Sequence, residues 1–404
     1  MIFTSPLCTD SAQPVPVSDI STLAFKLGRE NGFGDDTDAL LNIDGPTGKA
    51  MSYAEVYEMA SQIASGLQNK LRLTKGDVVT TYLLCDIHSH AIIHGTLMAG
   101  CSIMMEGPVY PVEEFASRLE QAKPKAIFTH PVHLGQVWAA LRMPGVVAAA
   151  SGGWPKIILT QDIDTGSGQQ TNAPEDIEVQ TIAELLSTAP YERLSINTWE
   201  EMDNTIALIG YSSGTTGKPK GILVPHRTLV SCLHQELTSK VMPLGKSYPC
   251  GDDDKGRRFP VDMVTFPPMM RIAQLVERYR IEAMYTTPTV PEEIVARWED
   301  ARLARYDWSS FKDLHSAGAP TSEIVVEQFV GQLGARISSP YGSSECLGIS
   351  FTFADSPQGS VGKLLPGIFA KVVDIQTGKG KSYSVNTSSS TIVKAARWLV
   401  VSAA

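Results

Sequence analysis

The chain has 404 residues, 43% of them hydrophobic and 19% charged, which suits a globular protein of two or three domains, or one large one, whose core needs neither disulfides nor metals. Its net charge of −9 argues against a nucleic-acid-binding protein, which needs a basic face, and its six cysteines contain no C-x-x-C pair that would indicate a zinc site or a disulfide framework. The N-terminus has no secretory pattern and no stretch of about 18 apolar residues occurs, so we expect a cytoplasmic protein without a membrane span.

The first half of the chain alternates between strand and helix patterns. Apolar, β-branched runs predict strands at residues 78–84, 126–129, 156–160 and 205–210. Helices are expected between them at residues 91–101 and 113–123, the second with Phe115, Leu119 and Ala122 on one face.

The second half continues the alternation. Apolar periodicity predicts helices over residues 269–279, 292–303 and 322–333. Strands are predicted at residues 283–287, 313–316 and 335–338. Strands separated by helices of about a dozen residues indicate βαβ units, so we predict an α/β fold built on largely parallel sheet.

Three segments interrupt this regularity. Residues 161–175 are polar and rich in turn formers, which predicts a surface loop. Residues 245–260 are charged and show no period, and the acidic run at 252–254 within them is interpreted as a solvated turn rather than a metal site. The last thirty residues, 375–404, contain no Asp or Glu, and their Ser/Thr run indicates a linker.

The segment that carries chemistry is residues 211–221, YSSGTTGKPKG, which follows directly on a predicted strand. It holds three glycines, four Ser or Thr hydroxyls and two lysines, a combination that suits a polyphosphate. It is not a Walker A loop, because only two residues separate Gly214 from Gly217-Lys218 and Pro219 comes next. The alternative interpretation is a flexible surface loop.

This loop resembles the signature of the AMP-forming acyl-adenylate synthetases, which include acyl-CoA synthetases, 4-coumarate–CoA ligases and firefly luciferase. Four further stretches agree with the family in order and spacing, and the resemblance covers roughly residues 40–375, closest to the coumarate-ligase and luciferase branch. The stretches are KGDVV at 75–79, YDWSSF at 306–311 followed by SAGAP at 316–320, YGSSE at 341–345 and VGKLLPG at 361–367.

The resemblance implies an α/β fold with two packed, mostly parallel sheets, helices around them and a small distorted barrel. It implies ATP-dependent activation of an aryl or fatty acid as an acyl-adenylate, followed by transfer to CoA or a carrier thiol. The substrate carboxylate attacks the α-phosphorus of ATP and pyrophosphate leaves, which requires positioning and charge neutralisation. ATP, Mg²⁺ and CoA are the expected ligands, and the site is expected at strand ends.

The family's site residues carry over by motif. Those implied to hold the β- and γ-phosphates are Ser212, Ser213, Gly214, Thr215, Thr216, Gly217, Lys218 and Lys220. Those implied around adenine and the acyl chain are Gly318, Ala319, Pro320, Tyr341, Gly342 and Ser343, with Tyr341 stacked on the adenine. Ser344, where the family usually has Thr, would bond the phosphate, and Glu345 would hold Mg²⁺. Lys220 and Glu345 are the expected catalytic residues.

Each of these residues has a plainer interpretation. Glu345 alone could be a solvated acid, and Tyr341 could be part of the core. Cys346 is expected to be a small buried residue and not a nucleophile. His226 and His234 lie on a predicted helix without an acidic partner nearby, so we expect them to be structural.

Parts of the family pattern are not found. The segment near 240–262 is atypically short where the family has a Pro-x-x-His stretch, and no carboxylate follows Asp374 to bind the ribose as a T-G-D motif would. The smaller C-terminal domain with its catalytic lysine is not visible either, since Lys379, Lys381 and Lys394 lack its motif. We therefore expect a truncated or mis-spliced chain, with an adenylation domain at residues 1–375 and an aberrant tail at 376–404 that is disordered or mis-spliced.

Three hypotheses follow. The chain is the adenylating domain of an acid–thiol ligase, or a catalytically inactive nucleotide-binding remnant. The third possibility is a stand-alone adenylating domain whose cap, the smaller C-terminal domain of the family, comes from another chain. We expect no nucleic-acid partner. A full-length parent could carry a peroxisomal signal, although this chain ends in Val401-Ser-Ala-Ala, which is not one.

Overall fold

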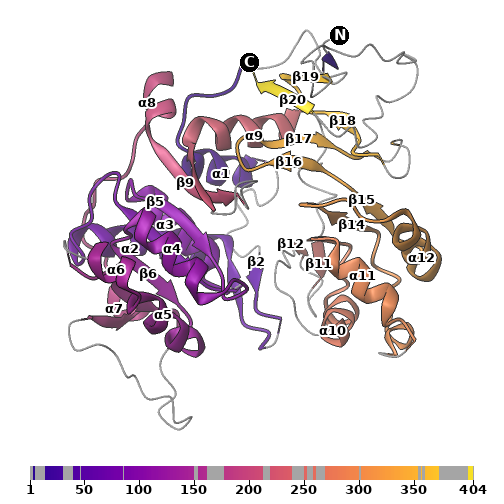
Figure 1. Ribbon diagram of the computed structural model, residues 1–404, viewed down its shortest axis with the longest axis horizontal. Coiled ribbons are helices and arrows are strands. Elements are labelled where there is room, and N and C mark those ends of the chain that lie inside the picture. The colour runs from indigo at the N-terminus through magenta and orange to yellow at the C-terminus, as the bar shows by residue number, and fades with distance from the viewer. Residues whose placement is uncertain are drawn as a thin grey trace. The chain divides into compact units, whose positions relative to one another are not determined.

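The computed structural model describes most of the chain in two units. The described residues are 3–4, 14–30, 40–45, 47–84, 86–149, 153–161, 177–212, 219–238, 250–252, 258–260, 269–299, 302–353, 356, 360–372 and 399–403. Unit 1 comprises Met1–Pro16, Asn31–Gly45 and Ser231–Ala404, and unit 2 comprises Val17–Glu30 and Pro46–Val230. Figure 1 labels their helices and strands.

Unit 2 is built on a seven-stranded sheet with the order β10-β9-β5-β4-β6-β7-β8. The strands are β4 (Val78–Tyr82), β5 (Ser102–Glu106), β6 (Ala126–Thr129), β7 (Lys156–Leu159), β8 (Val179–Thr181), β9 (Ile206–Ser212) and β10 (Lys220–Pro225). All neighbours pair in parallel except β10, which is antiparallel to β9. The four strands predicted in the first half of the chain are confirmed.

Helices connect these strands. They are α1 (Ile20–Gly28), α2 (Tyr53–Asn69), α3 (Ser89–Met98), α4 (Val112–Ala122), α5 (Leu134–Leu141), α6 (Pro144–Ala149), α7 (Ile182–Leu185) and α8 (Trp199–Asn204), and strand β3 (Ala50–Ser52) leads into α2. Helix α2 begins with a capping box in which the side chain of Ser52 accepts from the backbone of Glu55, and the carboxylate of Glu55 accepts from the backbone of Ser52. Gly95 of α3 lies against α2, where a Cβ would be 2.7 Å from the carbonyl oxygen of Ala60, so only glycine fits at this contact.

Both faces of the unit 2 sheet are covered. Met104 of β5 belongs to the buried cluster that α4 and α5 form on one face, whereas its neighbour Ile103 packs with Leu97 of α3. This is the alternation expected of a strand buried on both sides. Phe115 and Leu119 of α4 are buried in the first cluster with Ala122 packed against it, as the helical spacing predicts.

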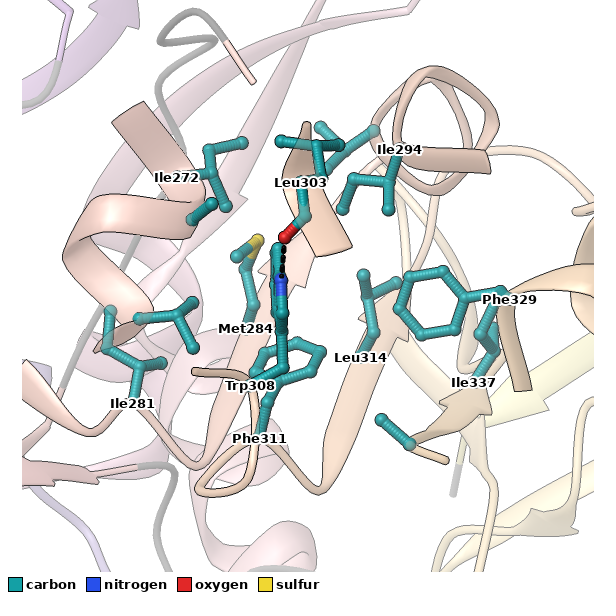
Figure 2. Packing of buried hydrophobic residues seen from close by; sticks show 14 of the residues in the cluster. Ile272, Ile281, Met284, Ile294, Leu303, Trp308, Phe311, Leu314, Phe329 and Ile337 are labelled. Atoms are coloured by element: carbon teal, nitrogen blue, oxygen red, sulfur yellow. Dashed lines mark hydrogen bonds between the residues drawn. The ribbon is translucent and has the colours of Figure 1, made fainter. Parts of the chain in front are cut away.

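Unit 1 contains a three-stranded parallel sheet with its own core. Its strands are β13 (Ala283–Thr286), β14 (Asp313–Ser316) and β15 (Arg336–Ser338), and its helices are α10 (Met269–Tyr279), α11 (Thr289–Ala296) and α12 (Glu323–Leu333). Figure 2 shows Leu314 of β14 pointing into a cluster with Phe311 and Phe329, while the indole N–H of Trp308 donates to the carbonyl oxygen of Leu303 at 2.9 Å. The buried indole is therefore satisfied.

Short antiparallel pieces complete unit 1. They are the sheet β16 (Tyr341–Ser343), β17 (Leu347–Phe351) and β18 (Lys363–Leu364), the sheet β1 (Phe3–Thr4), β19 (Ile368–Val372) and β20 (Leu399–Ala403), the hairpin β11 (Cys250–Asp252) and β12 (Arg258–Pro260), and strand β2 (Leu40–Ile43). Helix α9 (His226–Thr238) begins in unit 2 and ends in unit 1. The predicted α/β class is confirmed: each unit holds a parallel sheet, and small antiparallel sheets occur in the C-terminal part where the barrel was expected.

Two predicted segments differ from the structure. The helix predicted at 292–303 is wrong in extent, since α11 covers Thr289–Ala296. It begins earlier because Pro291 is accommodated in its first turn, and the chain leaves the helix at Arg297. A separate turn of 3₁₀ helix spans Leu303–Arg305. Residues 245–260, predicted to be irregular, include the hairpin β11–β12.

The tail also contains more structure than its composition suggests. Residues 399–403 form strand β20, which pairs with β19 over five residue pairs, from Ile368 opposite Ala403 to Val372 opposite Leu399. This strand was not predicted from the sequence. The rest of the predicted tail, 376–398, and most of the predicted loop at 161–175 lie outside the described residues. Within the described part of the chain, no helix is both long enough and apolar enough to cross a bilayer.

The core of unit 1 makes a stability prediction. Leu314 is completely buried, so Leu314→Ala should lower the free energy of unfolding by about 2–5 kcal/mol through lost apolar contact and the cavity left behind. Ile324 on α12 is 68% exposed, and Ile324→Ala should change the free energy by no more than about 0.5 kcal/mol. Urea denaturation followed by circular dichroism measures both, and equal effects of the two substitutions would contradict the packing in Figure 2.

Candidate functional site

In unit 2 the predicted phosphate-binding segment is the connection between β9 and β10. Ser212, the last residue of β9, lies opposite Lys220, the first residue of β10, and Tyr211 lies opposite Gly221. Lys220 is exposed. Because β9 is parallel to β5, this connection leaves the sheet at its carboxyl edge, where ligands bind in parallel α/β sheets. The predicted residues Ser213, Gly214, Thr215, Thr216, Gly217 and Lys218 lie outside the described residues.

In unit 1 a second predicted group also follows a parallel strand. Gly318, Ala319 and Pro320 come after β14 and are exposed. The turn that contains them is closed by a hydrogen bond of 2.8 Å between the hydroxyls of Ser316 and Thr321. Gly318 has a φ of +92°, a conformation that other residues rarely adopt, which explains the glycine at this position.

The third predicted group, residues 341–345, follows the neighbouring strand β15. The ring of Tyr341 is on the surface of unit 1, with 41% of the residue exposed, so the interpretation of Tyr341 as a core residue is wrong. Gly342 is required by the fold, because a Cβ there would lie 2.2 Å from the carbonyl oxygen of Leu347. Ser344 and Glu345 are exposed on the turn between β16 and β17.

Since β14 and β15 are parallel neighbours, the turns after them emerge at the same edge of the unit 1 sheet. The structure thus brings Gly318–Pro320 and Tyr341–Glu345 to one edge within unit 1, and Ser212 and Lys220 together within unit 2. Lys220 is exposed in unit 2, and Gly318–Pro320, Tyr341, Ser344 and Glu345 are exposed in unit 1. An exposed aromatic ring, a carboxylate and hydroxyls are groups that contact a nucleotide base, a hydrated cation and phosphate oxygens.

The fit of Glu345 to Mg²⁺ can be judged from its surroundings. The backbone N–H of Cys346 donates to the hydroxyl of Ser343 at 3.2 Å, which holds the turn that presents Glu345. Among the described residues no group of three or more His, Cys, Asp or Glu side chains is placed to hold a metal ion. A single exposed carboxylate fits Mg²⁺, which keeps several waters and takes its other ligands from substrate phosphates.

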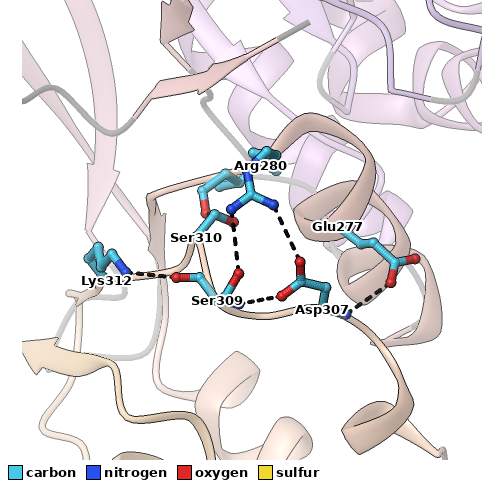
Figure 3. Close-up of polar contacts among 7 residues, drawn as sticks. Glu277, Arg280, Asp307, Ser309, Ser310 and Lys312 are labelled. Atoms are coloured by element: carbon cyan, nitrogen blue, oxygen red, sulfur yellow. Dashed lines mark hydrogen bonds and ion pairs between the residues drawn. The ribbon is translucent and has the colours of Figure 1, made fainter. Parts of the chain in front are cut away.

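The segment 306–312 that precedes β14 is fixed to helix α10. Figure 3 shows Arg280 donating to Asp307 and to the hydroxyl of Ser309, while the backbone N–H of Asp307 donates to Glu277 at 2.9 Å. The side chain of Lys312 closes the turn by donating to the carbonyl oxygen of Ser309 at 2.7 Å. With Trp308 and Phe311 buried, YDWSSF acts within unit 1 as an anchor for β14.

The histidine and cysteine interpretations can also be compared with the structure. His226 is fully buried, and its Nδ1 accepts the backbone N–H of Ile20 at 3.1 Å. Burial lowers the pKa of His226 to about 4, so the ring is neutral, as a structural residue requires. Cys346 is half-buried and packs against the apolar cluster of β17 and β18, which agrees with the expected packing role. His234 lies on the same helix α9 as His226.

Two polar groups near these segments were missed by the sequence analysis. His315, one residue before Ser316, is buried and stacked on Tyr285 with ring centroids 4.5 Å apart. In unit 2, Arg118 of α4 is buried between two carboxylates and two tyrosine rings, one of them Tyr211. The pairing of Glu114 with Arg118 at i and i+4 was readable from the sequence, but such pairs are common on exposed helix faces and do not indicate burial.

Comparison with known proteins places these motifs in context. The sequence matches the profile of the family described as AMP-binding enzyme over residues 30–253 and 260–384. The break in the match falls within the segment 245–260 that interrupts the regular pattern. Of curated proteins, the chain is similar to 4-coumarate-CoA ligase 1 of Narcissus pseudonarcissus, with 27% identity over 364 residues covering 83% of this chain and 61% of that protein.

Solved structures show the same fold. The chain is similar to a luciferase-like enzyme from the nonluminescent Zophobas morio mealworm, with a TM-score of 0.70, 18% identity and coverage of 95% of this chain and 86% of the other. It is also similar to the anthranilate CoA ligase AuaEII in complex with anthranoyl-AMP, with a TM-score of 0.69, 15% identity and coverage of 93% and 69%. The chain spans 60% to 64% of the length of the most similar curated relatives.

The buried His226 predicts a pH dependence of stability. Between its ordinary pKa of about 6.5 in the unfolded chain and its folded pKa of about 4, the unfolded chain binds a proton that the folded chain does not, so stability falls as the pH drops through this range. Replacing the ring by His226→Gln should make the loss of unfolding free energy between pH 7.5 and pH 5 smaller by about 2 kcal/mol.

The measurement is urea denaturation of both proteins at the two pH values. Val230→Ala, at a fully buried position on the same helix, is the matched control: it destabilises the fold without removing a titrating group and should keep the wild-type pH dependence. An unchanged pH dependence in His226→Gln would contradict the neutral, buried state of the ring.

Proposed function

Because this chain belongs to the family of AMP-binding enzymes, we propose that it activates a carboxylic acid with ATP, forming an acyl-adenylate and releasing pyrophosphate. The observation that carries this proposal is the pairing of Ser212 with Lys220 at the carboxyl edge of the unit 2 sheet. This pairing fixes where the glycine- and hydroxyl-rich connection starts and ends. An exposed lysine at its exit supplies positive charge for a triphosphate.

Different residues contact different parts of the substrates in the proposed reaction. Ser212 through Lys218 and Lys220 contact the β- and γ-phosphates, with the lysines neutralising charge as pyrophosphate leaves. In unit 1, Tyr341 offers its exposed ring to the adenine, and Gly318, Ala319 and Pro320 contact the adenine and the acyl chain without large side chains in the way. The hydroxyl of Ser344 bonds phosphate, and the backbone of Gly342 and Ser343 supports the nucleotide.

Glu345 holds Mg²⁺, which when bound neutralises phosphate charge. The reaction then consists of attack by an oxygen of the substrate carboxylate on the α-phosphorus of ATP. Neither a covalent enzyme intermediate nor a general base is required, because a carboxylate is already ionised at neutral pH. Positioning and charge neutralisation by these residues are sufficient for such a step.

The substrate is an aryl or fatty acid, and the acyl group passes from the adenylate to a thiol such as CoA. The names of two similar proteins, a 4-coumarate-CoA ligase and an anthranilate CoA ligase, favour an aromatic acid. Thioester formation by this chain is part of the same proposal.

A second candidate is nucleotide binding without turnover. It is favoured by one observation: residues 375–404 contain no Asp or Glu, so this segment does not supply the carboxylate that the family resemblance implies for the ribose. Such a protein would bind ATP through the same residues and would not form the adenylate.

The test that separates the two candidates is exchange of labelled pyrophosphate into ATP. With a panel of aromatic and fatty acids we expect exchange that depends on the acid and on Mg²⁺, since only reversible adenylate formation links the label to ATP. Binding of ATP without exchange for any acid would favour the second candidate. If exchange appears only after a partner protein is added, the adenylating role stands and the cap is supplied by another chain.

Substitution of the two expected catalytic residues tests the site. Lys220→Ala and Glu345→Ala should each lower the exchange rate by about 10²–10³-fold, because each removes a charge that stabilises the leaving pyrophosphate. Lys125→Ala and Glu327→Ala are matched controls at exposed positions in the same units, on the loop before β6 and on α12, and should exchange at the wild-type rate. Wild-type rates in Lys220→Ala or Glu345→Ala would refute the assignment of that residue.

A further inference from the structure

A buried group of charges lies directly beside the start of the phosphate-binding connection. Arg118 of α4 makes ion pairs with Glu106, the last residue of β5, and with Glu114, one turn earlier on α4. The side chains of Arg118 and Glu106 are 7% and 3% exposed, and that of Glu114 is 29% exposed. Burial raises the pKa of Glu106, and the guanidinium of Arg118 offsets part of that rise.

Two aromatic rings lie close to the same guanidinium. Its central carbon lies 4.2 Å from the ring centroid of Tyr110 and 5.0 Å from that of Tyr211. The hydroxyl of Tyr211 also donates to the backbone carbonyl oxygen of Arg118 at 3.3 Å. Tyr211 is therefore tied to Arg118 through both its ring face and its hydroxyl.

Tyr211 transmits this contact to the β9–β10 hairpin. It precedes Ser212 on β9, and on the return strand it faces Gly221, where a Cβ would lie 3.6 Å from the edge of the Tyr211 ring. Gly221 in turn follows Lys220 directly. One ring thus links the buried guanidinium to both strands at the point where they leave the sheet.

Stability alone does not explain this arrangement. A buried ion pair loses about as much in desolvation as it gains in attraction, and apolar side chains of similar volume would fill the same space at least as well. What Arg118 offers beyond an apolar residue is a planar fork that bonds two carboxylates at fixed angles while its face packs on aromatic rings. Such a group fixes orientation.

We infer that Arg118 is a positioning residue for the hairpin that carries Lys220, acting through the ring of Tyr211 and held in place by Glu106 and Glu114. This inference rests on the proposed function, because it assigns Arg118 to the affinity for ATP. A displacement of about 1 Å in a substrate-positioning group can cost roughly 100-fold in rate, so a modest shift of the hairpin has a measurable effect.

The experiment compares variants by the dissociation constant for Mg·ATP, measured by equilibrium dialysis, and by the KM values for ATP and acid in pyrophosphate exchange. Arg118→Lys keeps the charge but loses the planar fork and the stacking, and should weaken ATP binding by roughly 10- to 100-fold while the KM for the acid stays within about two-fold. Glu114→Gln, at the partly exposed carboxylate, should show a smaller change in the same direction.

Three further variants separate positioning from general destabilisation. Phe115→Leu changes a buried residue of the same helix, stacked on Tyr82 with centroids 4.1 Å apart, and should lower the melting temperature without changing the affinity for ATP. Tyr211→Phe keeps the ring over the guanidinium and should retain most of the affinity that Tyr211→Leu loses.

The outcomes are distinct. Unchanged ATP affinity in both Arg118→Lys and Glu114→Gln overturns the inference and leaves the proposed function intact. The inference is also overturned if Phe115→Leu loses as much ATP affinity as an Arg118→Lys variant of the same melting temperature, because the role of Arg118 is then only structural. If Arg118→Lys fails to fold, the ATP affinities of Glu114→Gln, Tyr211→Phe and Tyr211→Leu decide whether the inference stands. A wild-type chain that binds no ATP overturns the proposed function and this inference with it.

Discussion

Parallel pairing of strands is the constraint on which the candidate site depends. In a parallel sheet every strand ends at the same edge, so the segments that follow the strands are gathered there whatever their order in the sequence. In unit 2 this places the connection after β9 beside the ends of β4 and β5, and in unit 1 it places the turns after β14 and β15 side by side. Residues far apart in the sequence, such as Gly318 and Tyr341, become neighbours through the pairing of Leu314 with Ile337 and of His315 with Ser338.

The same constraint explains why charge is buried at this edge. Glu106 ends β5 in register with Tyr82 at the end of β4, so a carboxylate is placed where the sheet meets α4. A lone buried carboxylate would be costly, and Arg118 offsets that cost from the helix above. Here the partner from the following helix also contacts the ring of Tyr211 next to the candidate phosphate site.

Local patterns in the sequence predicted much of the fold and missed what depends on tertiary packing. Apolar runs and helical spacing located strands such as β9, predicted at 205–210 and observed at Ile206–Ser212, because these signals lie within a dozen residues. The predicted and observed bounds of helix α10 coincide. The extent of α11 was wrong, since the buried Leu303 continues the apolar pattern although the chain has already left the helix at Arg297. Strand β20 was missed because pairing with a distant strand, and not composition, defines it.

For the candidate site, too, the local motifs could be predicted and the tertiary contacts could not. The motifs at 211–221, 316–320 and 341–345 are contiguous, and a contiguous motif can be identified without knowing the fold. The burial of Arg118 could not be predicted, because it depends on segments that approach from elsewhere and bring Glu106 and Tyr211. The i, i+4 spacing of Glu114 and Arg118 occurs equally in solvent and in a core.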